Sequence, residues 1–168
     1  MNQQIFLAIN GLAGRSQFFD TLGVFFAEKF LYVFAIIIVA LWLDKRLRTH
    51  VYLAVLAAAV SRLFIVEVIK RIVNHPRPYE IVANIHQLLA DNEHGMSFPS
   101  GHTVIYFSFA FAFYGTKYFW PFIILASLGS LARVYVGVHF PIDIAASVII
   151  AAVIAAALRG LFKKPISS

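Results

Sequence analysis

The sequence contains no cysteine, and that absence excludes three kinds of chemistry. A chain without thiols forms no disulfide bond, binds no metal through thiolates and uses no cysteine nucleophile. Charged residues are also scarce. They make up 13% of the chain, whereas an average water-soluble domain contains about 25%. A soluble globular enzyme is therefore not expected.

Hydrophobic residues, in contrast, are abundant. They account for 61% of the chain, which includes 17 phenylalanines, and the mean hydropathy is +0.81. Side chains of this kind suit a surface that faces lipid, so we predict an all-α fold, a polytopic membrane helical bundle. The length of 168 residues predicts one domain that covers residues 1–168. The net charge of +6 is interpreted as a signal of membrane topology, and no nucleic-acid partner is inferred from it.

Five apolar segments are predicted to cross the membrane, after a short N-terminal helix that does not. Residues 1–14 are about half as long as a membrane-spanning helix needs to be, so we expect an interfacial helix there. The first basic residue is Arg15, so no cleaved signal peptide is expected. The five spans are predicted at about 20–43, 51–73, 100–115, 119–136 and 142–158, with Asp20 or Thr21 capping the first.

Two charged residues, Arg62 and Glu67, fall inside the second predicted span. Charges at membrane depth are costly unless they are paired, so we expect structural ion pairs. The candidates are Arg62 with Glu28 of the first span, and Glu67 with Arg71 one turn later. In the alternative interpretation, Glu67 sets the direction in which the ammonium group of Lys70 points.

The distribution of basic residues predicts the orientation of the chain. Alternation of the spans places residues 44–50, 115–119 and 159–168 on one side. That side carries seven basic residues: Lys45, Arg46, Arg48, Lys117, Arg159, Lys163 and Lys164. The other side keeps three, Arg15, Lys29 and Arg71, once the cations discussed below are assigned to a site. The positive-inside rule therefore places the first side in the cytoplasm and the second side on the outer face of the membrane.

A polar, turn-forming segment, Ser97 to Thr103, precedes the long apolar run that follows it. Ser100 is a good helix N-cap, so the backbone N–H groups that follow it would point outwards together. Such a helix start is a site suited to anions, and here it carries His102.

The predicted topology brings this helix start to the same membrane face as three other polar pieces of the chain. Lys70, Arg77 and Arg133 would supply positive charge for phosphate oxygens. Two histidines, His102 and His139, could divide nucleophilic attack from protonation of the leaving oxygen.

Asp143 follows His139 by four residues and could fix the tautomer of that imidazole. Taken singly, each of these signals is weak. A histidine and an aspartate at this spacing are more often an ordinary helix-start contact, and cations at span ends are more often interface anchors. Their combination at one face is what favours a phosphate site.

Three spaced blocks of this sequence resemble the signature of the type 2 phosphatidic acid phosphatase (PAP2) superfamily of lipid phosphatases. The blocks are Lys70-x6-Arg77-Pro78, then Pro99-Ser100-Gly101-His102, then Arg133-x5-His139-x3-Asp143. One departure is Ala132, which stands where the third block often begins with serine. Within the superfamily, the chain resembles the small bacterial undecaprenyl-diphosphate phosphatases in its compact size and in the sequence of residues 97–103.

The resemblance implies a role for each residue of the blocks. His139 would be the nucleophile through a phosphohistidine, His102 the general acid, and Asp143 the group that orients His139. Five residues would hold the phosphate: Lys70, Arg77, Ser100, Gly101 and Arg133. No metal and no cofactor would take part, and the cations around the two histidines would repel a divalent ion.

The predicted function is hydrolysis of the terminal phosphate of a lipid phosphate or diphosphate at the outer membrane face. The substrate expected from the resemblance is undecaprenyl diphosphate, whose cleavage recycles the carrier lipid of cell-wall synthesis. The alternatives are a phosphatase for phosphatidylglycerophosphate, phosphatidic acid or lipid A phosphates, and a lipid phosphotransferase. The non-enzymatic alternative is a small anion-binding transporter or assembly protein.

The loop 79–96 is predicted to be a surface amphipathic helix, or else a lid over the site. His75, His86 and His94 lie in this outer region and are expected to take no part in catalysis.

Overall fold

The structure, a computed structural model, describes residues 1–89 and 96–162. Within those residues all regular secondary structure is helical, which confirms the all-α class. The elements in chain order are α1 (Asn2–Asn10), α2 (Gln17–Val24), the π-helix η1 (Phe25–Lys29), α3 (Phe30–Leu43), α4 (Arg48–Ala59), the π-helix η2 (Val60–Val66), α5 (Glu67–Val73), α6 (Pro78–Ile81), α7 (Gly101–Ala112), α8 (Phe119–Tyr135) and α9 (Pro141–Phe162).

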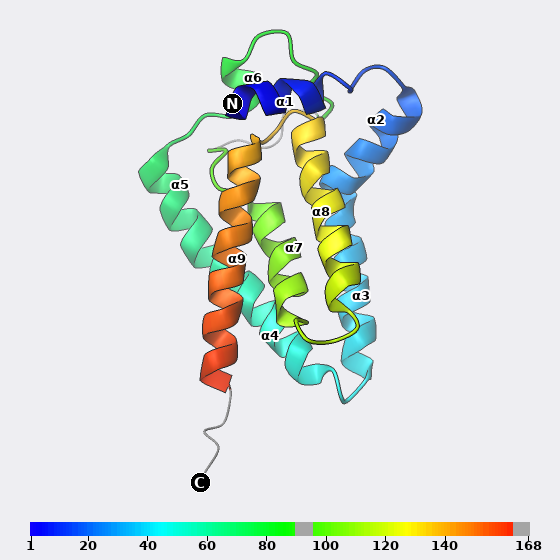
Figure 1. The fold of residues 1–168 in the computed structure, drawn as a ribbon, viewed down its shortest axis with the longest axis vertical. Helices are drawn as coiled ribbons and strands as arrows, with labels where there is room; N and C mark the ends of the chain where they lie inside the picture. The colour runs from blue at the N-terminus through cyan, green and yellow to red at the C-terminus, as the bar shows by residue number, and fades with distance from the viewer. Residues whose placement is uncertain (90–95, 163–168) are drawn as a thin grey trace.

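Three helical runs are long and apolar enough to cross a membrane. They are Gln17–Leu43, Arg48–Ile81 and Pro141–Phe162, and α8 is a shorter apolar helix of 17 residues. The long helices run side by side between two ends of the bundle (Figure 1). Exposed aliphatic and aromatic side chains cover their outer faces. The chain is a multi-pass membrane protein.

Helix α7 is shorter than the predicted third span and is the central helix of the bundle. Its 12 residues extend about 18 Å at 1.5 Å per residue, whereas the hydrocarbon core of a bilayer is about 30 Å thick. It packs against α4, α8 and α9, and nine of its residues are buried. In Figure 1 its N-terminus begins below the upper ends of α8 and α9. The start of α7 therefore lies inside the bundle.

An aromatic cluster fixes α7 against its neighbours. Phe34 of α3 is fully buried, and its ring lies 4.9 Å from that of Tyr106 and 5.7 Å from that of Phe109, both on α7. Phe122 of α8 completes the cluster, 5.8 Å from Phe34. Each buried aromatic side chain removes about 150–250 Å² from solvent, so this cluster is a main source of packing energy between α3, α7 and α8.

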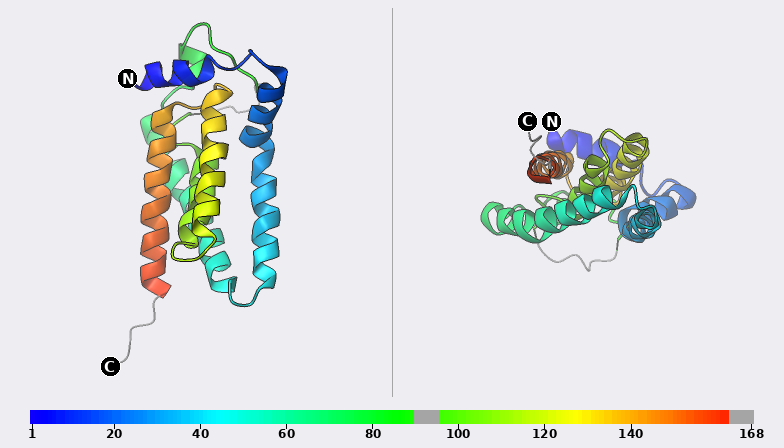
Figure 2. Two further views of the ribbon diagram at one scale, coloured as in Figure 1. Left: turned by 45° about the vertical axis from the view of Figure 1, so that its right-hand side comes forward. Right: turned by 90° about the horizontal axis from the view of Figure 1, so that it is seen from below.

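The N-terminal helix α1 lies across the end of the bundle instead of along it, as a helix that does not cross the membrane should (Figures 1 and 2). Phe6 is buried against Phe140, with ring centroids 5.2 Å apart. The buried side chain of Asn10 donates to the carbonyl oxygens of His86 (2.7 Å) and Tyr135 (2.8 Å). These contacts tie α1 to the loop after α6 and to the end of α8.

The first crossing helix begins earlier than predicted. Ser16 is the N-cap of α2, so neither Asp20 nor Thr21 has that role. Asp20 instead accepts hydrogen bonds from the Gly14 N–H (3.0 Å) and the Tyr135 hydroxyl (2.7 Å).

The outer loop is not the predicted amphipathic helix over the part that the structure describes. Only α6 is helical there, and residues 82–89 follow an irregular path. The Leu88 N–H donates to Val136 O (3.2 Å). Leu88 and Leu89 also pack against a cluster of small aliphatic residues: Ala27, Ala132, Val136 and Val138. Gly137 has a φ of +87°, and a Cβ there would lie 2.7 Å from His86 O, so the loop contacts the turn after α8 at a point where a side chain would not fit. Residues 90–95, with His94, lie outside the described residues.

Candidate active site

A polar cavity of about 370 Å³ opens at the start of α7. Its lining residues come from α3, η2, α5, the loop before α6, α7 and the loop before α9: Leu31, Arg62, Lys70, Arg77, Gly101, His102, Ile105 and His139. Five of the eight residues predicted for a phosphate site therefore meet in one cavity. The other three, Ser100, Arg133 and Asp143, are fully buried behind its wall.

His139 and Asp143 form a buried pair at the entrance to α9. Pro141 begins the helix, which places Asp143 in its first turn, where a carboxylate is favourable. The Asp143 Oδ2 accepts from the Phe140 N–H (2.8 Å) and lies 3.3 Å from His139 Nδ1. A proton on Nδ1 directed at this carboxylate leaves Nε2 of His139 as the nitrogen with a free electron pair.

Ser97 contacts both members of this pair, and no sequence pattern distinguished it from the rest of its segment. Its hydroxyl donates to Asp143 Oδ2 and lies 3.4 Å from His139 Nδ1. Its own N–H donates to His75 O (2.8 Å), which fixes the backbone. The contact joins residues 46 positions apart, so no local pattern could have revealed it.

The surroundings of His139 keep its imidazole neutral. Burial lowers the pKa of His139 to about 4, an effect that its hydrogen bond to Asp143 opposes and that the nearby Arg133 and Arg77 reinforce. A neutral imidazole is the form that can attack phosphorus. The side chain is therefore prepared for nucleophilic chemistry over the whole neutral pH range.

The start of α7 is tied directly to the start of α9. The Ser147 hydroxyl donates to Asp143 O (2.7 Å) and to Ser100 O (3.0 Å). Ser100 is the N-cap, as predicted, and its side chain accepts from the Thr103 N–H (3.4 Å). Because that side chain is buried, Ser100 does not line the cavity, and its predicted contact with phosphate stays a prediction. Gly101 and His102 present the first turn of α7 to the cavity.

The two signature arginines hold the loop that carries His139. Arg77, which lines the cavity, donates from Nη1 to Val138 O (3.2 Å). Arg133 is fully buried, and its Nη1 donates to Ala27 O (2.9 Å) in η1. Its carbonyl oxygen accepts from the N–H groups of Val138 and His139 (3.2 and 3.3 Å). Both guanidinium groups add positive charge near the imidazole.

Arg62 also lines the cavity, which the sequence did not indicate. It forms an ion pair with Glu67, so neither predicted pairing, with Glu28 or with Arg71, is the one observed. Glu28 pairs instead with its neighbour Lys29 (2.7 Å).

The other described histidines of the outer region, His75 and His86, do not line the cavity. His75 packs edge-on against Phe140, with ring centroids 5.6 Å apart, and does not line the cavity. His86 lies beside Gly14. Ala132, the departure from the signature, is buried against Ala27 and Val136. Within residues 1–89 and 96–162, no three His, Asp or Glu side chains come together as a metal site would require.

Comparison with known proteins identifies the family of this chain. Residues 51–166 match the PAP2 superfamily. The chain is 34% identical over 158 residues to the undecaprenyl-diphosphatase BcrC of Bacillus subtilis (strain 168), an alignment that covers 92% of this chain and 80% of the relative.

Two solved structures share the fold. The crystal structure of Aquifex aeolicus LpxE superposes with a TM-score of 0.81 at 26% identity, over 95% of this chain and 94% of the other. A PAP2-type phosphatidylglycerolphosphate phosphatase from Bacillus subtilis gives a TM-score of 0.70 at 21% identity, over 98% and 89% of the two chains. The resemblance inferred from the three blocks is thus confirmed: this membrane-embedded phosphatase belongs to the PAP2 superfamily.

Proposed function

We propose that this protein is a lipid phosphatase that removes the terminal phosphate of undecaprenyl diphosphate at the extracytoplasmic face of the bacterial inner membrane. The observation that carries the proposal is the buried pair of His139 and Asp143 beside a cavity with three cationic side chains, Arg62, Lys70 and Arg77. The similarity to BcrC, which is named an undecaprenyl-diphosphatase, supports the choice of substrate.

The reaction proceeds in two displacements at the terminal phosphorus. Nε2 of His139 attacks phosphorus, a P–N bond forms, and the P–O bond to the leaving phosphate breaks while His102 donates a proton to that oxygen. Water then attacks the phosphohistidine, His102 takes a proton from that water, and inorganic phosphate leaves as the P–N bond breaks. Lys70, Arg77 and the first turn of α7 hold the phosphate oxygens and offset the charge on them.

The position of the cavity suits a lipid substrate. Two aliphatic side chains, Leu31 and Ile105, line it alongside the polar groups. A headgroup can therefore occupy the cavity while its prenyl tail remains among the lipid-facing helices. This arrangement favours a lipid over a soluble phosphate ester.

The orientation rests on the basic residues at the opposite end of the bundle. Lys45, Arg46, Arg48, Lys117 and Arg159 lie there, and Lys163 and Lys164 lie outside the described residues. The chain has no cysteine, so single substitutions give clean labelling sites. A membrane-impermeant maleimide should label Ala83→Cys in intact cells and Lys45→Cys only after lysis. The reverse pattern would invert the orientation.

The experiment that tests the function is release of phosphate from a panel of purified lipids in the presence of EDTA. Undecaprenyl diphosphate should be the preferred substrate, and activity should persist without divalent metal. Preference for phosphatidylglycerophosphate, phosphatidic acid or lipid A phosphates would contradict the proposed substrate. Transfer of phosphate to an acceptor lipid would identify a phosphotransferase, and the absence of turnover on every lipid would favour an anion-binding protein.

A further inference from the structure

Arg62 is a cation of the active-site cavity that belongs to none of the three signature blocks. Its side chain lines the cavity with Lys70 and His102. It lies directly against the start of α7, because a Cβ on Gly101 would be 2.7 Å from Arg62 Nε and 3.3 Å from Cζ. The glycine therefore leaves the room that the guanidinium occupies beside the first turn of α7.

The π-helix η2 explains how Arg62 reaches the cavity. Eight residues separate Arg62 from Lys70, which is about 2.2 turns of an α-helix and would place the two side chains about 80° apart. A π-helical segment takes more residues per turn, so η2 brings the two residues closer to the same face. Such segments are frequent at functional sites.

Glu67 holds Arg62 without using all of its donors. The ion pair joins Nη1 of Arg62 to Glu67 Oε1, and both side chains are partly exposed, at 35% and 40%. A guanidinium group has five N–H donors, so donors remain for a second anion. Arg62 is thereby oriented within the cavity and can still bind phosphate.

We propose that Arg62 binds the phosphate of a lipid diphosphate that remains on the lipid after cleavage, and so selects diphosphates over monophosphates. This inference rests on the proposed function. His102 is placed on the leaving-group side because it protonates the leaving oxygen, and Arg62 lies beside the same turn of α7. When a diphosphate is cleaved, the leaving group is itself a phosphate that gains negative charge. A monophosphate ester has an alkoxide leaving group and no second phosphate for Arg62 to hold.

The test compares Arg62→Gln with wild type on undecaprenyl diphosphate and on undecaprenyl phosphate, which share one tail. We expect kcat/KM for the diphosphate to fall about 10- to 100-fold, the range for loss of a charge-assisted hydrogen bond. Activity on the monophosphate should change less than about threefold, because the second phosphate is missing from that substrate. Arg62→Lys, which keeps the charge but not the fork of donors, should fall between wild type and Arg62→Gln.

Arg71→Gln is the matched control, because Arg71 lies on the same helical run, is exposed and does not line the cavity. It should leave both activities unchanged. Equal losses of Arg62→Gln on both substrates, or no loss on either, would overturn the proposal for Arg62 alone. If the wild-type protein did not cleave the diphosphate, the proposed function would fail, and the assignment of Arg62 would fall with it.

Discussion

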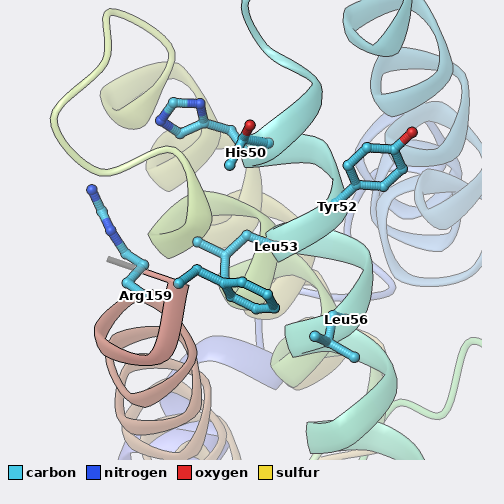
Figure 3. Close-up of a pocket in the computed structure, with 7 residues that line it drawn as sticks. His50, Tyr52, Leu53, Leu56 and Arg159 are labelled. Carbon is cyan, nitrogen blue, oxygen red and sulfur yellow. The ribbon is translucent and has the colours of Figure 1, made fainter. Parts of the chain in front are cut away.

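A cavity lined by histidine and arginine side chains lies near each end of helix α7. The cavity at its N-terminus is the candidate active site, of about 370 Å³. The second cavity, of about 350 Å³, lies at the opposite end of the bundle, between the start of α4 and the end of α9 (Figure 3). Its lining residues are Thr49, His50, Tyr52, Leu53, Leu56, Arg159 and Phe162. The two cavities are similar in size, but the first is lined by three cationic side chains and two histidines and the second by one of each.

The two cavities differ in chemistry because they lie at opposite ends of helix α7. At its C-terminal end the carbonyl groups have no partner within the helix, and Arg159 donates to Phe111 O (3.4 Å) and Tyr114 O (2.9 Å). His50 stacks on Phe113, with ring centroids 5.6 Å apart. Among the described residues its buried Nδ1 has no hydrogen-bond partner, whereas Nδ1 of His139 lies 3.3 Å from Asp143. At the N-terminal end the helix presents N–H groups and a positive dipole instead. A histidine and an arginine favour phosphate only at that end.

The largest difference between the cavities should appear when each histidine is removed. His139→Ala should lower turnover about 10⁴- to 10⁶-fold, as loss of a nucleophile does, while the protein stays folded. His50→Ala should keep specific activity within about twofold, because it lines only the second cavity. Phosphate release by both purified variants would measure this. Near wild-type activity of His139→Ala would refute the assigned mechanism.

The carboxylate that pairs with His139 gives the next effect. Asp143→Asn should lower kcat about 10³- to 10⁴-fold, because the amide no longer fixes the tautomer that leaves Nε2 free to attack. Ser97→Ala should lower it less, about tenfold, since Asp143 keeps the Phe140 N–H as a donor. Single-turnover kinetics would separate these losses from changes in binding. A larger loss in Ser97→Ala than in Asp143→Asn would reverse the roles of the two residues.

Substitution of Arg77 should change activity, whereas substitution of Arg159 should change stability. Arg77→Gln should reduce kcat/KM about 100-fold through loss of a charged contact to phosphate. Arg159→Gln should leave specific activity unchanged and lower the free energy of unfolding by about 1–3 kcal/mol, because carbonyls at the end of α7 lose a donor. Kinetics and thermal unfolding in the same detergent would test both. A loss of activity in Arg159→Gln without loss of stability would give the second cavity a role in function.

The smallest effect concerns pH. Because the pKa of His139 is lowered to about 4, kcat/KM should fall less than about twofold between pH 7 and pH 5.5, once the titration of the substrate phosphate, with a pKa of about 6, is taken into account. An imidazole with the ordinary pKa of about 6.5 would lose about tenfold. The folded state favours neutral His139, so its contribution to stability is present above about pH 6.5 and is lost as pH falls towards 4. A tenfold loss of kcat/KM at pH 5.5 would contradict the burial of this side chain.

The sequence predicted the parts of the site that have fixed local spacing. His139 and Asp143 are one helical turn apart, and Ser100 precedes an apolar helix, so their relations follow from neighbouring residues. Alternation of the apolar segments was enough to bring Lys70 and Arg77 to the same end. These inferences needed only the helical period and the membrane.

Contacts that depend on tertiary packing could not be predicted from the sequence. The hydrogen bond from Ser97 to Asp143 joins residues 46 positions apart in the sequence. The direction of the Arg62 side chain depends on the π-helix η2, which no residue type in the sequence indicates. The length of α7 was overestimated because an apolar helix inside a protein and one in lipid have the same composition. The outer loop has the pattern of an amphipathic helix, but its polar backbone groups pair with Asn10 and with the end of α8 instead.

Ser147 has a mechanical consequence for the enzyme. Its hydroxyl bonds the backbone at the start of both α7 and α9, the helices that carry His102 and the partner of His139. The proposed proton donor and the proposed nucleophile are therefore linked through one shared hydroxyl group. A change in bilayer thickness would act first on the lipid-facing helices around them. We therefore expect membrane composition to have little effect on the separation of the two imidazoles.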